Sequence, residues 1–370
     1  MPITKSQIKS VIEKLENGES KSFFFLPDFE RPSGGIKVAY DHVKCMNENG
    51  FNATIIHQKK GFRPTWLDEF YTLKEDGTYE GIPVVYLEDK PLELTMSDFF
   101  FIPEGFPNVM ENMAKQNTPC KRIVFCQNWY YVLNALPPGV YWDQFGIRDC
   151  LSVSHIQSDY LKMIMPFLNI KNVVGHISSE FFHKPETRED KKLKVAFIPS
   201  RFDNGTKSHN VIKTFYSIFP YFRFIEFVQI GGLTNEQYAK TLRECAFYVH
   251  FDEYSSWGTA PIEAYLSECL IAAWDGVGGR EYMNSENTWV VENGDIFKLA
   301  MAIGNMIEKY LMDDISEETY RSMEATTMMY SKEAEKDSVI TVHRDYIEER
   351  IKELEKMCEI APEEEDPKNA

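Results

Sequence analysis

The alternation of short apolar runs with amphipathic stretches along most of the 370-residue chain limits its fold more than any other feature. Residues 22–27 and 99–102 are apolar runs of strand length, whereas residues 36–49 follow the helical period and are closed by Gly50. Strands that alternate with helices are typical of folds with parallel sheets. The sequence therefore predicts an α/β protein.

A charged segment without apolar periodicity interrupts this alternation at residues 184–194, and the strand-and-helix pattern restarts after it. The chain also exceeds the ~100–200 residues of a usual single domain. We therefore expect an N-terminal Rossmann-like domain at residues 1–183, a linker at 184–194 and a C-terminal Rossmann-like domain at 195–345. Residues 346–370 are expected to form a C-terminal helix and an acidic tail. Two doubly wound domains of this kind would face a cleft, with ligands at the carboxyl ends of their strands.

Charge and apolar patterning exclude several classes of partner. The formal net charge of −17 would repel nucleic acid and anionic membrane surfaces, although a few local cations can still hold one phosphorylated ligand. No run reaches the ~20 apolar residues of a membrane-spanning helix. The first 20 residues read as an amphipathic helix that docks on its own domain, with docking on a membrane surface as the less favoured alternative.

The number and spacing of the cysteines indicate whether the protein is in an oxidising or a reducing compartment. There are seven scattered cysteines, an odd number without a CxxC pair. This pattern favours reduced thiols and a cytoplasmic location over disulfides or a zinc site. His155 and His176 have no partner at metal-ligand spacing, so we expect no metal site.

Two short motifs place phosphate-binding groups at strand ends. Gly34 and Gly35 lie between a predicted strand and a predicted helix, where free amides and the helix dipole suit a phosphate; an ordinary tight turn is the alternative. Arg201 follows the first strand of the second domain, and Lys207 lies in the glycine-containing loop after it. These cations would hold a diphosphate, unless they are solvated loop charges.

The stretch from Phe251 to Met283 carries a specific resemblance. It is similar to the donor-binding core of the family 4 glycosyltransferases, whose hallmark reads roughly E-G-F-G-L-P-x-x-E-A-M-A-x-G, followed by a strand and a G-G-x-x-E turn. Residues 255–264 lie on that template, and residues 278–281 match the turn. Arg201 and Lys207 match the family's diphosphate-binding pair. With Gly34 and Gly35 on its N-terminal glycine loop, the resemblance covers most of the chain.

The resemblance implies a GT-B architecture and specific roles for matched residues. Glu263, on the second hallmark glutamate, would accept hydrogen bonds from the nucleotide ribose, and its alternative role is to complement a helix dipole. Gly278 and Gly279 would present backbone amides to the transferred sugar and phosphate. Glu281 is either a sugar-hydroxyl acceptor or a solvated turn residue.

Two positions depart from the family pattern. Ser255 occupies the place of the first hallmark glutamate, and Glu253 and Asp252 are near it but out of register. Either one of these carboxylates reaches the sugar through a local bulge, or sugar recognition differs from the family's, or activity has been lost. At the end of a central strand, where the family often has a histidine, this chain has Gln127, Asn128 and Trp129. Gln127 and Asn128 would hydrogen-bond sugar or acceptor hydroxyls but cannot act as general bases at neutral pH. Trp129 would stack on a sugar face, and its alternative role is ordinary packing at a strand-to-helix junction.

The function implied by the resemblance is retaining transfer of a sugar from a nucleoside diphosphate sugar to a saccharide or glycoconjugate hydroxyl, as in polysaccharide biosynthesis. The nucleotide sugar would be a co-substrate, and no cofactor or metal would be needed. Arg201, Lys207 and the Gly34–Gly35 amides would stabilise the charge on the leaving diphosphate. The competing hypotheses are a sugar-nucleotide epimerase or phosphorylase on the same fold and a non-catalytic nucleotide-sugar-binding protein.

Overall fold

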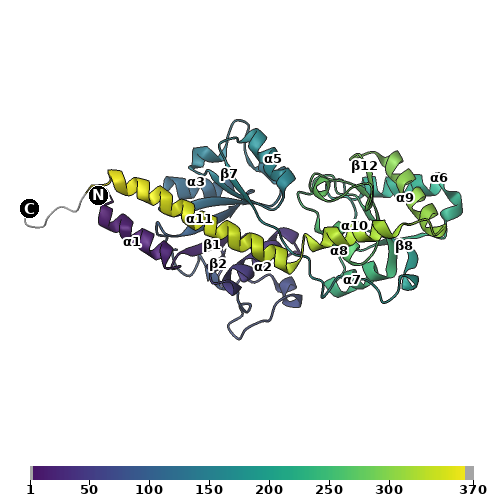
Figure 1. Ribbon diagram of the computed structural model, residues 1–370, viewed down its shortest axis with the longest axis horizontal. Coiled ribbons are helices and arrows are strands. Elements are labelled where there is room, and N and C mark those ends of the chain that lie inside the picture. The colour runs from purple at the N-terminus through teal and green to yellow at the C-terminus, as the bar shows by residue number, and fades with distance from the viewer. Residues whose placement is uncertain (1–2, 363–370) are drawn as a thin grey trace, which may run out of the picture. The chain divides into compact units, whose positions relative to one another are not determined.

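The chain forms two compact units, and each consists of a parallel sheet with helices against it (Figure 1). The computed structural model describes residues 3–362, so the last eight residues of the predicted acidic tail lie outside the described part. Unit 1 contains the described residues up to 152, residues 161–173 and residues 335–362. Unit 2 contains Val153–Tyr160 and Val174–Ala334.

The core of unit 1 is a seven-stranded parallel sheet in the order β3-β2-β1-β4-β5-β6-β7. Its central strands are short apolar runs that are buried on both faces, as expected when helices cover a parallel sheet. The strands are β1 (Lys21–Phe25), β2 (Asn52–His57), β3 (Val84–Tyr86), β4 (Phe99–Pro103), β5 (Lys121–Cys126), β6 (Asp149–Ser152) and β7 (Asn169–Asn172).

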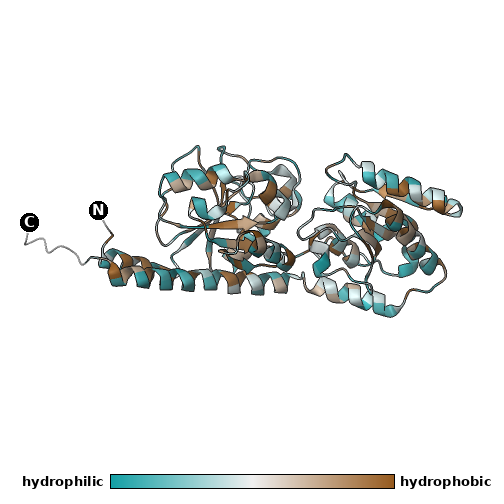
Figure 2. Ribbon diagram, turned by 90° about the horizontal axis from the view of Figure 1, so that it is seen from above, coloured by the Kyte–Doolittle hydropathy of each residue, from teal (hydrophilic) through white to brown (hydrophobic). Residues whose placement is uncertain are grey.

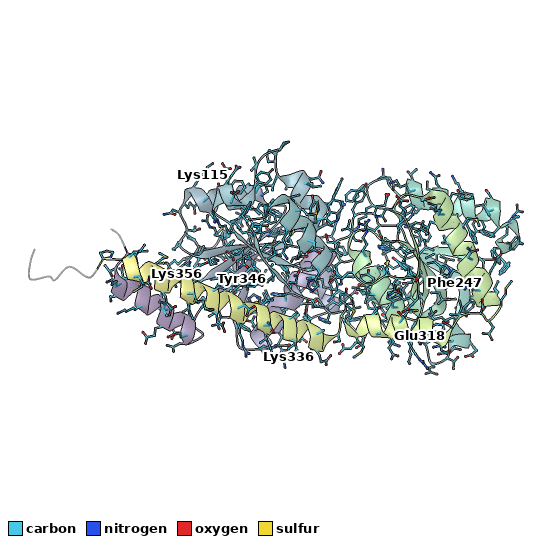
Figure 3. The ribbon with its side chains drawn as sticks, turned by 45° about the horizontal axis from the view of Figure 1, so that its top comes forward. Lys115, Phe247, Glu318, Lys336, Tyr346 and Lys356 are labelled. Carbon is cyan, nitrogen blue, oxygen red and sulfur yellow. The ribbon has the colours of Figure 1, made fainter. Side chains whose placement is uncertain are left out.

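The helices of unit 1 come from both ends of the chain. They are α1 (Lys5–Glu16), α2 (Gly34–Glu48), η1 (Thr65–Glu69), α3 (Pro107–Lys115), α4 (Trp129–Ala135), η2 (Trp142–Phe145), α5 (His155–Ile164), whose last residues belong to this unit, and α11 (Lys332–Ile360). α1 and α11 lie side by side (Figure 1), and the Lys5 amide donates to the Pro362 carbonyl oxygen at 3.1 Å. Tyr346 of α11, labelled in Figure 3, donates its hydroxyl to the Cys150 carbonyl oxygen at 3.0 Å and so anchors the helix on β6.

Unit 2 contains a five-stranded parallel sheet in the order β12-β11-β10-β8-β9. The strands are β8 (Lys192–Phe197), β9 (Glu226–Gln229), β10 (Cys245–His250), β11 (Leu270–Trp274) and β12 (Thr288–Val291). The helices are η3 (Arg188–Asp190), α6 (Thr206–Ile218), η4 (Pro220–Phe222), α7 (Asn235–Glu244), α8 (Thr259–Leu266), η5 (Gly278–Glu281), α9 (Ile296–Leu311) and α10 (Glu317–Met328).

The sequence from Ser316 toward Met357 has a helical pattern that predicts one long helix, but the structure interrupts it between α10 and α11. The carbonyl oxygen of Tyr330 accepts from the Ile177 amide at 3.0 Å, so it is diverted from the helical ladder. Ser331 then starts the next helix, because its hydroxyl oxygen accepts from the Ala334 amide at 3.2 Å. The sequence predicts one helix here, and the structure has two.

The charged segment at residues 184–194 lies within unit 2 and is anchored there. The ammonium of Lys191 donates to the Cys245 carbonyl oxygen at 2.8 Å, and Arg188 pairs with Glu317 at 2.7 Å. The chain passes between the units at residues 152–174 and again at 334–335.

Hydropathy follows this architecture. In Figure 2 the hydrophobic colour follows the strands inside each unit, whereas α11 alternates hydrophobic and hydrophilic residues along its length. None of the helices between residues 3 and 362 is both long and apolar enough to cross a bilayer.

Strand order determines where each sheet can bind a ligand. In unit 1 the chain runs outward from β1 to β2 and β3 and then returns to β4 on the other side of β1. In unit 2 it runs from β8 to β9 and returns to β10 on the other side of β8. Such reversals splay the loops at the carboxyl ends of the two strands and open a crevice. The loops after β1 and β4, and those after β8 and β10, are therefore the favoured binding loops.

Candidate functional site

The loop after β8 is organised by one aspartate. The carboxylate of Asp203 accepts from the Ser200 hydroxyl at 2.6 Å and from the amides of Gly205 and Lys207, both at 3.0 Å. Burial acts to raise the pKa of Asp203, but these hydrogen bonds outweigh it and hold the pKa below its ordinary value. The ionised carboxylate thus fixes the start of α6 and the position of Lys207.

Two acidic residues after β10 face the two predicted cations. Arg201 Nε lies 3.3 Å from Asp252 Oδ2, and Lys207 pairs with Glu253. The hydrogen bond that Lys207 donates to the Glu253 carboxylate raises the pKa of Lys207 above its ordinary value. Because β8 and β10 are neighbours at the reversal of strand order, the structure brings both cations and both carboxylates together beyond the carboxyl ends of these two strands.

Arg201 is well placed to change partners. Its side chain is 58% exposed, whereas that of Asp252 is 13% exposed. An exposed ion pair contributes little to stability, so a ligand phosphate can replace the aspartate with little loss. Glu253, the predicted sugar contact, lies beside Lys207 and therefore next to any phosphate that Lys207 binds.

The glycine turn after β11 differs from its prediction. The Gly276 amide donates to Asn293 Oδ1 at 3.1 Å, and the amides of Val277 and Gly278 donate to the Ser255 carbonyl oxygen at 3.2 and 2.9 Å. The Gly279 amide donates to the Asp275 carbonyl oxygen at 2.9 Å. In this structure these amides are therefore engaged within unit 2, so contact of Gly278 and Gly279 with a ligand remains a prediction that requires their amides to change acceptors.

The close packing of this turn explains two of its glycines. A Cβ on Gly278 would lie 2.0 Å from the Ser256 carbonyl oxygen, which no side chain tolerates. Gly276 has a φ of +58°, and a Cβ there would lie 2.5 Å from Ser255 Oγ. Ser255 is buried beneath the turn, and its hydroxyl has no hydrogen-bond partner among the described residues. Ser255 and Gly278 therefore hold the two loops together.

Glu263 lies in the second turn of α8, beyond the positions where a helix dipole acts strongly. Its Oε2 accepts from the Tyr238 hydroxyl at 2.5 Å. Burial is the main cause that raises the pKa of Tyr238 well above its ordinary range, with Glu263 adding to it. Tyr238 therefore stays protonated and orients the carboxylate.

Glu281, at the end of η5, accepts from the His155 amide through both carboxylate oxygens, at 3.3 and 3.2 Å. Both residues belong to unit 2. The carboxylate thus meets a donor at the start of α5, where the helix dipole favours a negative charge. This contact is an alternative to the two predicted roles of Glu281.

His250, the last residue of β10, was not predicted from the sequence as a site residue. Its side chain is buried, and its Nε2 has no hydrogen-bond partner among the described residues. Burial lowers the pKa of His250 to about 4, so the ring is neutral at physiological pH. Its only sequence signal is a polar residue that ends an apolar strand beside Asp252.

In unit 1 the predicted glycine loop meets a residue from β5. Gly34 and Gly35 begin α2, and their amides have no acceptor among residues 3–362. A Cβ on Gly35 would lie 2.6 Å from Gln127 Oε1, so only glycine allows this side chain so close to the helix start. The structure therefore places the Gln127 side chain against Gly35 in the first turn of α2.

Asn128 and Trp129 take part in the start of α4. Asn128 is the N-cap, and its side-chain oxygen accepts from the Tyr130 amide at 2.9 Å. The indole of Trp129 packs edge-on against Tyr130. The local geometry gives Asn128 a structural role that the sequence analysis did not weigh, and the packing of Trp129 matches the alternative stated for it.

Glu104 is a second residue that the sequence analysis missed. It directly follows β4, which lies between β1 and β5, and it is only 4% exposed. Its Oε1 accepts from the Asn128 amide at 2.7 Å. Burial raises the pKa of Glu104 from its ordinary value near 4.5 to about 7. A carboxylate directly after an apolar strand was the available signal.

The raised pKa of Glu104 predicts a pH-dependent contribution to stability. Between about pH 4.5 and 7 the native carboxyl keeps a proton that the unfolded chain has released, so stability falls as pH rises. As pH rises across this window, we expect the free energy of unfolding of Glu104→Gln to increase relative to that of the wild type by about 1.4 kcal/mol for each pH unit. Urea unfolding at pH 4.5, 6 and 8 measures the gain. A constant difference between the two proteins would contradict the prediction.

Several known proteins resemble this chain in sequence or in fold. No protein-family model matches the chain. An α-1,6-glucosyltransferase of Actinobacillus pleuropneumoniae is 23% identical over 264 residues, which cover 71% of this chain and 75% of that protein. Sucrose-phosphate synthase of Thermosynechococcus elongatus is 10% identical, with a TM-score of 0.60 over 88% of this chain and 99% of that chain.

Two further solved structures share the fold. Anabaena HepE in complex with UDP is 12% identical, with a TM-score of 0.60 over 89% of this chain and 98% of that chain. A mutant of S. aureus TarM, in complex with Fondaparinux, alpha-GlcNAc-glycerol and UDP, is 10% identical, with a TM-score of 0.63 over 87% and 99% of the two chains. The protein therefore has the GT-B glycosyltransferase fold, as the sequence predicts. It is homologous to an α-1,6-glucosyltransferase.

Proposed function

We propose that this protein is a glycosyltransferase that moves a sugar from a nucleoside diphosphate sugar to an acceptor hydroxyl. The observation that carries the proposal is the pairing of Arg201 and Lys207 with Asp252 and Glu253 at the reversal of strand order in unit 2. Two partly exposed cations beyond the carboxyl ends of neighbouring parallel strands suit a diphosphate. Homology to a glucosyltransferase supports the same reaction class.

The nucleotide we propose is UDP, and the sugar to test first is glucose. Solved structures with this fold hold UDP, UDP-glucose, or UDP with a sugar. The curated relative is named as a glucosyltransferase. The acceptor we propose is a saccharide or glycoconjugate hydroxyl.

The chemistry that we assign to unit 2 is stabilisation of the leaving group. As the bond between the anomeric carbon and the β-phosphate oxygen breaks, negative charge grows on the diphosphate. Arg201 and Lys207 would neutralise this charge by exchanging their carboxylate partners for phosphate oxygens. In these roles the two cations would replace a metal ion, and we expect transfer to persist in a chelator.

We propose a retaining reaction on the front face of the sugar. The acceptor oxygen would bond to the anomeric carbon on the face that the diphosphate leaves, and the acceptor proton would pass to a phosphate oxygen. Such a route needs no dedicated protein base, which is compatible with Gln127 at a position where the resembling family often has a histidine.

A panel of ligands tests the proposal. Thermal unfolding should shift upward with UDP and UDP-glucose and much less with GDP, ADP and their sugars, because a bound ligand stabilises the native state by mass action. The product formed with a saccharide acceptor is then analysed by NMR for its anomeric configuration. An inverted product would overturn the retaining route. Failure of every nucleotide sugar to bind would overturn the function.

A nucleotide-sugar-binding protein without transfer activity is the second candidate. The observation that favours it is Ser255, which replaces the first hallmark glutamate and is buried beneath the glycine turn. Binding of UDP-glucose without transfer to any member of a broad acceptor panel would support this candidate. Conversion of the nucleotide sugar without an acceptor would instead support an epimerase.

Glu263 provides a more specific prediction within the proposed function. We expect Glu263→Gln to weaken UDP binding about tenfold or more, because a ribose hydroxyl loses a hydrogen bond to a charged acceptor. Tyr238→Phe is the matched control, since it removes the donor to Glu263 but leaves the carboxylate, and it should change affinity by less than about threefold. Isothermal titration with UDP compares the variants. Equal affinity of Glu263→Gln and the wild type would remove Glu263 from the site.

A further inference from the structure

Unit 1 contains a cavity of about 610 Å³ at the amino-terminal edge of its sheet. The loop before β5, the start of β5, the residues before β6 and the last turns of α11 line it. Lys356, labelled in Figure 3, marks this part of α11, where Glu353 and Met357 reach the cavity. Its volume is in the range of pockets that hold small molecules.

Two of the four basic residues that line the cavity are neutralised within the protein. Lys121 Nζ lies 2.7 Å from Asp149 Oδ2 and 2.5 Å from Glu353 Oε1. Arg350 pairs with Glu353 at 3.1 Å and also donates to the Met96 carbonyl oxygen at 3.1 Å. The two carboxylates that line the cavity are therefore both engaged by Lys121 and Arg350.

The other two basic residues, Arg122 and Arg148, have no ion-pair partner among the described residues. Arg122 Nη1 is buried and has no hydrogen-bond partner in this part of the chain, and burial lowers the pKa of this guanidinium. Arg148 is exposed and directly precedes β6. Two uncompensated guanidinium groups thus share one cavity in a chain of net charge −17.

Leaving a buried charged donor without a partner is unfavourable, because the group has lost its water without gaining a protein acceptor. The backbone nevertheless makes room for Arg122. Gly146 has a φ of +70°, and a Cβ there would lie 2.8 Å from Arg122 Nη2. An anion that enters the cavity would supply the missing acceptor.

This cavity is distinct from the binding loops described above. Gly35, Glu104 and Gln127 follow the carboxyl ends of β1, β4 and β5, whereas Arg122 and Arg148 lie at the opposite ends of β5 and β6. Strands of this length separate the two edges by roughly 17–20 Å. A ligand at one edge therefore does not reach the other unless it is larger than the cavity.

We propose that the cavity is a second ligand site, where Arg122 and Arg148 bind the phosphate group of a small phosphorylated molecule. A guanidinium group donates two parallel hydrogen bonds to phosphate oxygens, and two such groups match a phosphate dianion. The cavity has room for a sugar-sized body beyond the phosphate. This site is additional to the proposed donor site of unit 2.

Isothermal titration of the full chain tests the site with inorganic phosphate, glycerol 3-phosphate and glucose 6-phosphate as probes. The variants are Arg122→Gln with Arg148→Gln, and Arg201→Ala with Lys207→Ala. We expect saturable binding of glucose 6-phosphate by the wild type and by the Arg201/Lys207 variant. Binding should be at least tenfold weaker in the Arg122/Arg148 variant. Arg344→Gln, an exposed change on α11, is the matched control and should bind like the wild type.

Each other outcome has a definite meaning. Equal binding by the Arg122/Arg148 variant, or loss of binding only in the Arg201/Lys207 variant, would overturn the proposal. Binding to phosphatidylglycerol vesicles without binding of any free phosphate ester would assign the arginines to a lipid headgroup and overturn the small-molecule site. The thermal midpoint of Arg122→Gln separates structure from binding. If Arg122 serves to bind a ligand, its replacement by Gln should leave the thermal midpoint unchanged or raise it. If Arg122 stabilises the fold, the replacement should lower the midpoint.

Discussion

Arg201→Ala is expected to lower the turnover number for sugar transfer by a factor on the order of a hundred to a thousand. Removing one preorganised donor to a developing charge raises the barrier by ~2.7–4 kcal/mol. The Arg201 side chain is largely exposed, so solvent screens its ion pair with Asp252 and the variant should keep the wild-type thermal midpoint within a few degrees. Steady-state kinetics with UDP-glucose and an accepted saccharide measure the effect.

Lys207→Ala should behave in the same way, with the loss mainly in kcat because the charge grows during the reaction. Two exposed cations of unit 2 are matched controls. Lys213 lies further along α6, and Arg223 precedes β9 at the opposite edge of the sheet. Their alanine variants should retain activity within about twofold. Near-normal turnover by Arg201→Ala and Lys207→Ala would contradict the proposed leaving-group role.

A buried pair of histidines is expected to make unit 1 unstable in acid. His42 of α2 and His343 of α11 approach each other at 2.7 Å through their Nε2 atoms. Aromatic rings surround them, with Phe24 and Phe125 against His42 and Phe101 against His343. Since one Nε2 must donate and the other accept, the accepting ring is neutral, and the contact is lost when both rings are protonated.

Burial lowers the pKa of His42 to about 3, and burial together with His42 lowers that of His343 well below its ordinary value of 6.5. Below about pH 6.5 the unfolded chain therefore binds protons that the native state does not, and stability falls as pH falls. Each histidine should lower the free energy of unfolding by about 1.4 kcal/mol for each pH unit below about pH 6.5. The free energy of unfolding at pH 5 should therefore be about 4 kcal/mol lower than at pH 7.5 because of this pair.

A variant with both His42→Leu and His343→Leu tests this prediction. Replacing both partners with apolar residues of similar size is nearly neutral at pH 7.5, but it removes the two titrating groups. Urea unfolding at pH 7.5 and pH 5 should show the wild type losing about 4 kcal/mol more than the variant. His209→Gln, an exposed change on α6, should keep the wild-type pH dependence. An equal loss in the double variant would show that the pair does not titrate in this range.

Local sequence signals predicted the elements of the fold well. The capping box at Thr234 and Gln237 is present in the structure and opens α7. The apolar run at residues 22–27 overlaps β1 (Lys21–Phe25), and the helical pattern at residues 36–49 overlaps α2, which starts two residues earlier and ends one residue earlier. These signals act between neighbouring residues, so they can be read without the fold. The break at Tyr330 was missed because it depends on a hydrogen bond to Ile177.

The candidate site was predictable only in part. The positions of Arg201 and Lys207 after a strand indicated a phosphate site, and the structure places both at a strand-order reversal. Their pairing with Asp252 and Glu253 joins loops about fifty residues apart and has no local signal. The same holds for the buried Glu104, whose pKa depends on what covers it.

The sequence by itself determined the parallel α/β architecture and the chain order of its strands and helices. It also determined the two cations that follow β8, Arg201 in the loop after the strand and Lys207 at the start of α6. Only the tertiary structure decided which donors and acceptors are already paired. The amides of Val277 and Gly278 bind the Ser255 carbonyl oxygen, while Arg122 stays without an acceptor. The physical reason is range, because propensity and capping act within a few residues, whereas burial and hydrogen bonding depend on segments that only folding brings together.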